Sequence, residues 1–273
     1  MRRLSRAKRV QVVGMLAEGM GLRATAQASG VARVTVEKLL RDLGEVCGEY
    51  QDRMLRNLAC RRVNCDDIIW SFVYARQQNV ERARRAPAEA GDIWTWIARC
   101  GNSMLIPTWR VGQRDASTGL AFVRDVLGRL RHRMRLTANG QGVCLEAVEA
   151  PLATEINEAL IREAFGPEEY RGDAGRPSER LTGRTSVDRM TVKRFTREHT
   201  GFSKKLEMHL LALAFQLACH NFVKPHRLHR SIPAVVAGVT DRPWGYEDLV
   251  RLLEEHEAGE LRERLRARQT MTH

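Results

Sequence analysis

The sequence predicts an α/β protein in which a mixed sheet flanked by helices follows an all-α helix-turn-helix domain. Apolar residues repeat with a helical period over residues 4–47, and strand-like apolar segments separated by turn residues follow them. The chain has 273 residues, 43% of them hydrophobic, which is enough for a sizeable core and two domains. We expect a helix-turn-helix domain at 1–58, the sheet domain at 59–240 and a carboxy-terminal helix at 241–273.

The amino-terminal segment has the pattern of three short helices. Gly30 separates an expected second helix, 22–29, from a third, 33–43, and glycine permits the left-handed backbone that such a turn requires. Ala26 is small enough to let two helices cross closely. The outward positions of the third helix are Arg33, Thr35, Lys38 and Arg41. The pattern predicts a DNA-binding helix-turn-helix, and the alternative is a three-helix core with a solvated basic face.

The charge of the chain favours a polyanionic partner. Lys and Arg number 45 against 33 acidic residues, a formal net charge of +12, which suits nucleic acid but also acidic membranes or ribosomal contacts. The apolar stretch 206–223 is interrupted by polar residues and predicts a buried helix, so we expect no membrane span. The cysteines lack a CxxC pair, which favours reduced thiols in a cytoplasm over a zinc site. They are Cys47, Cys60, Cys65, Cys100, Cys144 and Cys219.

Two adjacent acids lie inside an apolar run that reads VNCDDIIWSF from Val63. A carboxylate in such a strand is costly unless it is paired or bound to a cation. We therefore expect Asp66 or Asp67 to face a metal or a basic group. Because successive side chains of a strand point to opposite faces, only one of the two can line a given site.

The segments that follow predict the order of the sheet. Strands are expected at 63–75, 92–99 and 104–111, then a helix at 117–133 and a short strand at 134–138. A three-strand meander, a helix and a fourth strand predict a mixed sheet, and this order matches a ribonuclease-H-like fold.

A glycine- and proline-containing loop is expected at 166–184, and the chain then becomes strongly basic. Such a run either contacts phosphate or forms a solvated helix face. The candidate phosphate contacts are Lys193, Arg194, Lys204 and Lys205.

Eight blocks together resemble the insertion-sequence-one type of bacterial transposases, in order and spacing over nearly the whole chain. They are KRVQVVGMLAEGM at Lys8, GVARVTVEKLL at Gly30, VNCDDIIWSF at Val63, GDIWTWIA at Gly91, LTANG at Leu136, LEAVE at Leu145, KRFTREHTGFSKKLEMH at Lys193 and NFVKPHRLHRSIPAVVAGVTDRPW at Asn221. The resemblance implies a helix-turn-helix that recognises the terminal inverted repeats of the element and a ribonuclease-H-like domain with a DDE triad. It also implies that target DNA is a second substrate and that the protein forms a homo-oligomer in a synaptic complex. The expected localisation is the bacterial cytoplasm, in association with the nucleoid.

By the same resemblance, the triad falls on Asp66, Asn139 and Asp188, with Asp66 and Asp188 as ligands of Mg²⁺ or Mn²⁺. Two such ions about 4 Å apart can clamp the attacking and leaving oxygens of a phosphodiester displacement. Asn139 is a neutral amide where the family has aspartate, so cation binding is weakened. The Asp188 side chain is shorter than the glutamate of the family. The stretch that follows it is about six residues shorter than in the family. A change of six residues rotates a position on a helix by roughly 240°, which changes the direction in which Asp188 points.

One further departure lies within the first block. Ile68 and Ile69 stand where the family has a single isoleucine, and one extra residue reverses the faces of a strand unless a bulge absorbs it.

These departures set the functional expectation: a DNA transposase of an insertion sequence, with metal-dependent strand cleavage and transfer impaired in this copy. The alternative is a catalytically inactive, degenerate or repurposed transposase that acts only as a DNA-binding protein. An RNA-handling nuclease has little support, because no RNA-stacking aromatic motif is found. His226 and His229 are expected in a structural turn instead of a metal site, and the expected core residues include Trp70, Trp94 and Trp96.

Overall fold

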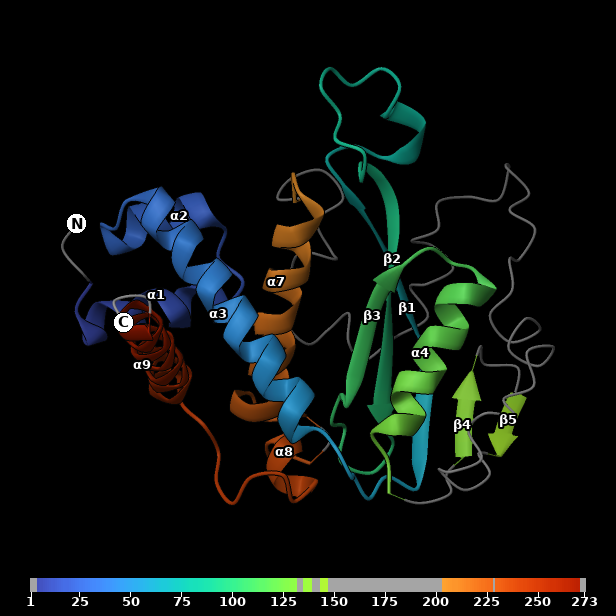
Figure 1. Cartoon of the computed structure of the whole chain (residues 1–273). Helices are drawn as coiled ribbons and strands as arrows, with labels where there is room; N and C mark the ends of the chain where they lie inside the picture. The colour runs from blue at the N-terminus through green and yellow to red at the C-terminus, as the bar shows by residue number, and fades with distance from the viewer. Residues whose placement is uncertain (1–3, 132–134, 139–142, 147–202, 228, 271–273) are drawn as a thin grey trace.

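The protein has a mixed α/β architecture, as the sequence predicts. The computed structural model describes residues 4–131, 135–138, 143–146, 203–227 and 229–270 (Figure 1). Amino-terminal helices, a sheet and carboxy-terminal helices pack together, and the main hydrophobic core takes residues from all three predicted segments.

Helices α1 (Arg6–Ala17), α2 (Leu22–Ser29) and α3 (Arg33–Met54) form the amino-terminal part. The Ser5 hydroxyl accepts a hydrogen bond from the Lys8 amide and caps α1. Helix α2 ends at Gly30, whose φ of 68° is the left-handed conformation expected there. The turn that leads into α3 therefore agrees with the sequence prediction.

Helix α3 is longer than predicted. It continues eleven residues beyond Leu43, to Met54, through Gly44 and Gly48. Glycine normally disfavours a helix interior, but a Cβ at position 44 would lie 2.4 Å from the Leu211 carbonyl oxygen. Glycine fits here because α3 and α7 (Leu206–Ala218) cross with their backbones almost in contact.

The sheet has the strand order β3-β2-β1-β4-β5. Its strands are β1 (Arg62–Val73), β2 (Gly91–Cys100), β3 (Thr108–Gly112), β4 (Arg135–Ala138) and β5 (Val143–Glu146). Strand β4 is parallel to β1, and the other pairs are antiparallel. The third strand was expected from Met104, but Met104 has a φ of 61° and its amide donates to the Cys100 carbonyl in a turn, so β3 begins only at Thr108.

Helices cover both faces of the sheet (Figure 1). On one face, α4 (Ala116–Gly128) packs through Phe122, whose ring centroid is 5.9 Å from that of Trp96. On the other face, Leu213 of α7 lies in a buried cluster with Ile69 and Ile97. Trp96 is fully buried, which confirms its prediction as a core residue, whereas Trp70 and Trp94 are half-buried.

The carboxy-terminal elements close the core over the first three helices. Helix α7 continues into a short π-helix, Cys219–Val223, and is followed by α8 (Pro233–Val236) and α9 (Tyr246–Thr270). The combined helix 206–223 is long and apolar enough to cross a membrane, but 72% of it is buried inside the protein, as expected for a core helix. Helix α9 packs on α1, where Arg9 donates two hydrogen bonds of 3.1 Å to the Glu257 carboxylate.

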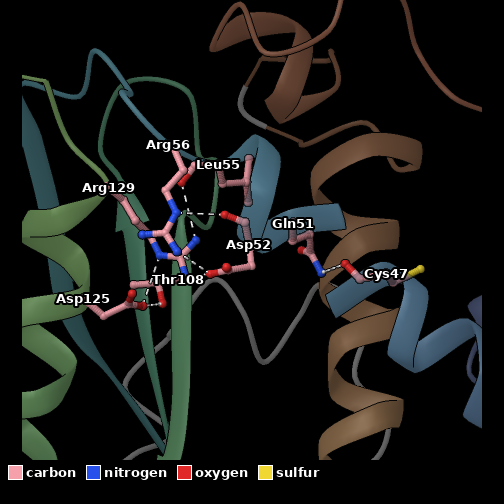
Figure 2. A network of polar contacts seen from close by, with 8 residues as sticks. All are labelled: Cys47, Gln51, Asp52, Leu55, Arg56, Thr108, Asp125 and Arg129. Carbon is pink, nitrogen blue, oxygen red and sulfur yellow. Dashed lines mark hydrogen bonds and ion pairs between the residues drawn. The ribbon is translucent and has the colours of Figure 1, made fainter. Parts of the chain in front are cut away.

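A polar network joins the end of α3 to the sheet (Figure 2). The buried Arg129 guanidinium donates to Asp52 at 2.6 Å, to Asp125 at 3.1 Å and to the Leu55 carbonyl at 3.4 Å. Thr108 of β3 donates to the same Asp125 carboxylate. Helix α3 is therefore held at its carboxy-terminal end by α4 and β3, and its amino-terminal end lies at the edge of the molecule.

Candidate nucleic-acid interface

The first two turns of α3 present an exposed basic face. Its buried stripe, which includes Val36 and Leu39, packs on the core, so the opposite side faces solvent. Arg33 is exposed, and the Lys38 side chain is 70% exposed. Val34 lies between them on the same face and is 73% exposed, the highest value among the large hydrophobic residues described as exposed.

Two of the predicted contact residues lie differently from the sequence expectation. Thr35 is half-buried at the border of the stripe and is not fully outward. Arg41 forms an ion pair with Glu207 in the first turn of α7. Lys38 also has a partner, Asp42, at 2.6 Å one turn further along.

These ion pairs leave the surface accessible to phosphate. Exposed ion pairs contribute only about 0–1 kcal/mol each, so phosphate oxygens can compete for Lys38 and Arg41. The amino-terminal end of α3 also carries the positive end of the helix dipole, which favours an anion. Ala32 provides no side-chain cap there.

A second pair of predicted contacts lies just before α7. Lys204 and Lys205 are both exposed. The preceding residue, Ser203, forms a bridge with Val73 at the end of β1, and its carbonyl accepts the Tyr74 amide at 2.9 Å. Lys193 and Arg194 lie outside the described residues.

The structure describes only part of the predicted triad. The backbone of Asp66 lies in β1, whereas Asn139 and Asp188 lie outside the described residues. No group of three His, Cys, Asp or Glu side chains that could hold a metal ion is found within the described part of the chain. The donor set that Mg²⁺ or Mn²⁺ would need is therefore not assembled by the described residues.

A β-bulge marks the Asp66 position. Asn64 pairs with Arg99 and Asp67 with Ile97, so Cys65 and Asp66 together oppose the single residue between them on β2. The bulge precedes Ile68 and Ile69, which pair in regular register with Trp96 and Thr95. Bulges often lie beside active sites, where they redirect a side chain.

The segment after α7 contains a group of histidines. His220 is buried and its Nε2 donates to the Met104 carbonyl at 3.0 Å. His226 lies 6.0 Å from it, ring centroid to centroid, in the turn that the His226 amide closes with the Ser231 carbonyl. Burial is the main cause that lowers the pKa of His220 to about 4, and Arg99 and His226 lower it further.

This histidine predicts acid sensitivity. Above pH 6.5 the imidazole is neutral in both the folded and the unfolded state; below it the unfolded state binds a proton that the folded state excludes until about pH 4. We expect the free energy of unfolding to fall by about 3 kcal/mol between pH 6.5 and 4 through His220. Urea unfolding at several pH values measures this loss. In the His220→Gln variant, the slope of the free energy of unfolding against pH should correspond to one proton fewer. An unchanged slope would show that His220 is not the group responsible for the loss of stability.

Comparison of the chain with models of protein families, with curated protein sequences and with solved structures gave no match.

Proposed function

We propose that this protein is derived from an insertion-sequence transposase and binds duplex DNA sequence-specifically through α3. The observation that carries the proposal is the exposed face of Arg33, Val34 and Lys38, which follows the left-handed turn at Gly30. A helix presented in this way fits the major groove, where its first residues reach base edges. The net charge of +12 supports a polyanionic partner.

The three side chains suit different parts of the duplex. Arginine binds guanine O6 and N7 with two hydrogen bonds, and an exposed valine methyl can contact the C5-methyl group of thymine. Lysine contacts phosphate or guanine without a fixed geometry. We assign base reading to Arg33 and Val34, and backbone or guanine contact to Lys38.

The arrangement of the sheet supports the transposase origin. A three-strand meander is followed by α4 and then by β4 parallel to β1, which is the order expected for a ribonuclease-H-like domain. The described strand β5 is antiparallel to β4.

A second candidate function, metal-dependent cleavage of the bound DNA, is favoured by the bulge at Asp66. The parallel pairing of Asn64 with Thr137 brings this end of β1 beside the end of β4 at Ala138, which Asn139 follows directly in the sequence. A carboxylate at 66 and a second carboxylate at 139 would supply hard oxygen ligands to Mg²⁺. With Asn139 in place of aspartate, we propose that binding persists and cleavage is weak or lost.

The amide at 139 makes a direct test possible. In Mg²⁺ or Mn²⁺, we expect the native protein to bind a duplex carrying the flanking inverted repeat without cutting it at a measurable rate. The Asn139→Asp variant should gain cleavage, because it restores a charged ligand, and adding Asp66→Ala should abolish that gain. Gel analysis of end-labelled duplex reports both results. Cleavage by the native protein that disappears with Asp66→Ala would instead show an active transposase.

A further inference from the structure

The loop between β1 and β2, residues 74–90, forms an arm that projects beyond the sheet (Figure 1, teal loop at the top). It carries four arginines and two glutamates, a net charge of +2. The charged residues are Arg76, Arg82, Arg84, Arg85, Glu81 and Glu89.

Local contacts give the arm a defined shape. The Tyr74 hydroxyl donates to the Arg84 carbonyl at 2.6 Å, which ties the base of the arm to its far side. The Gln77 amide donates to the Asp92 carboxylate at 3.0 Å, and a short 3₁₀ turn, Gln77–Asn79, follows. Gly91 has a φ of 132°, and a Cβ there would lie 2.2 Å from the Gln77 side-chain oxygen. The arm is therefore a folded feature that can hold its arginines in place.

The arginines of the arm divide into two groups. Arg76 lies over the rings of Trp70 and Phe72, at 5.3 Å and 6.0 Å from their centroids, and stabilises the base of the arm. Arg82, Arg84 and Arg85 are exposed and form no ion pair with any residue that the structure describes.

Arg85 has an unusual backbone conformation. It has a φ of 60°, a left-handed conformation that glycine would adopt without steric cost. Residues kept in such a conformation often serve a function.

The position of the arm relates it to α3 through a chain of contacts. Its base pairs with Ser203, which precedes the exposed Lys204 and Lys205, and Glu207 in the next turn pairs with Arg41 of α3. In Figure 1 the upper end of α7 lies between the start of α3 and the arm. The segments that carry these basic residues, which are the start of α3, residues 204–205 and the arm, are thus linked along one side of the molecule.

We infer that the arm is a second contact to the same duplex, in which Arg82, Arg84 and Arg85 bind the phosphate backbone beside the segment read by α3. The guanidinium group suits this role because it donates two parallel hydrogen bonds to phosphate oxygens. Phosphate contacts position a protein on DNA without reading its sequence. The inference rests on the proposed function and adds a contact that extends the DNA footprint.

The test replaces Arg82, Arg84 and Arg85 together with glutamine and measures duplex affinity as a function of salt. Each phosphate contact contributes about 0.9 to the slope of log K against log salt, so three contacts give about 2.7. Between 50 and 200 mM salt, the native protein should lose about 40-fold more affinity than the variant. Lengthening the duplex by about 10 bp, one helical turn, should strengthen binding by the native protein and not by the variant. The ratio of specific to nonspecific affinity should change little.

A matched control removes the same charge elsewhere, with Arg61, Arg124 and Arg131 replaced by glutamine. Arg61 precedes the first residue of β1 and therefore lies at the end opposite the arm, and all three side chains are exposed. If the slope of log K against log salt changed equally in the arm variant and in the control, the effect would come from net charge alone, and the inference would be overturned. Retention of the native slope when the three arm arginines are replaced by lysine, with unchanged thermal unfolding, would support it.

Other outcomes separate the arm from the proposed function. If the native protein binds duplex DNA and the arm variant keeps its slope, the arm inference fails while α3 binding stands. If the native protein binds no duplex, the proposed function itself fails. If the arm variant loses affinity only for RNA of the same length, the partner of the arm is RNA and the inference is overturned.

Discussion

Replacing Gly44 by valine is expected to destabilise the protein by about 3 kcal/mol, at the upper end of the usual cost of overpacking a core. A Cβ at this position would lie 2.4 Å from the Leu211 carbonyl oxygen and 2.6 Å from the Leu211 Cβ. The nearest neighbour is backbone and cannot rotate away, so α3 and α7 must separate. Because α7 packs on the sheet and α3 carries the proposed DNA-contacting face, DNA binding should weaken together with stability. Urea unfolding followed by circular dichroism measures the change.

Gly48, one turn further along the same helix, provides the matched control. Its nearest neighbour would be the Ala214 Cβ at 3.7 Å, an ordinary van der Waals contact. Gly48→Ala should therefore stabilise the protein by about 0.5–1 kcal/mol, because alanine loses less backbone entropy in a helix. Opposite signs at the two glycines would establish the close crossing of α3 and α7. A neutral Gly44→Val variant would show that the two helices are not held this closely.

Replacing Arg33 and Lys38 together with alanine is expected to lower the affinity for the specific duplex by about 100-fold. A good base contact contributes about 1–3 kcal/mol, and the two residues lie on the exposed side of α3 with Val34 between them. Affinity for unrelated duplex should fall less, because nonspecific binding depends on total charge. Fluorescence anisotropy with both duplexes gives the ratio. Equal losses for the two duplexes would assign these residues to the phosphate backbone.

The control for this pair lies at the other end of α3. Arg53 and Arg56 are exposed, and they flank the carboxy-terminal end of the helix at Met54. Replacing both with alanine removes the same charge, and we expect little change in the specific-to-nonspecific ratio. A loss as large as that of the Arg33 and Lys38 variant would place the DNA elsewhere on the molecule.

The sequence predicts the local structure of the amino-terminal part well, because local residues determine it. The apolar stripe and Gly30 are enough to place α2 and the start of α3. The end of α3 is not predictable in this way, since Gly44 resembles a helix breaker until the tertiary contact with Leu211 is known. Arg129 is similar in part: its partner Asp125 is four residues earlier at helical spacing, but Asp52 is 77 residues away on α3, and no local pattern relates the two.

The candidate interface was predicted in part. Arg33 and Lys38 follow from the outward positions of α3, but Val34, which is 73% exposed, was not among the predicted contacts. Its place off the Val36 and Leu39 stripe was the available signal. The run of arginines at 82, 84 and 85 was likewise visible in the sequence, yet only the pairing of β1 with β2 places it in a loop that projects beyond the sheet.

The predicted triad depends on the spacing between distant segments, which local patterns do not determine. The structure describes the backbone at Asp66 and shows that a bulge absorbs one residue there. The positions Asn139 and Asp188 lie outside the described residues.

The affinity of the native protein for two duplexes tests the central claim most directly. One duplex carries the inverted repeat that flanks the gene, and the other has the same composition in scrambled order; both are titrated at several salt concentrations near 150 mM. We expect binding to the repeat to be at least about 10³-fold tighter and to weaken steeply with salt. Equal affinity for both duplexes, or affinity that does not change with salt, would contradict sequence-specific DNA binding through α3.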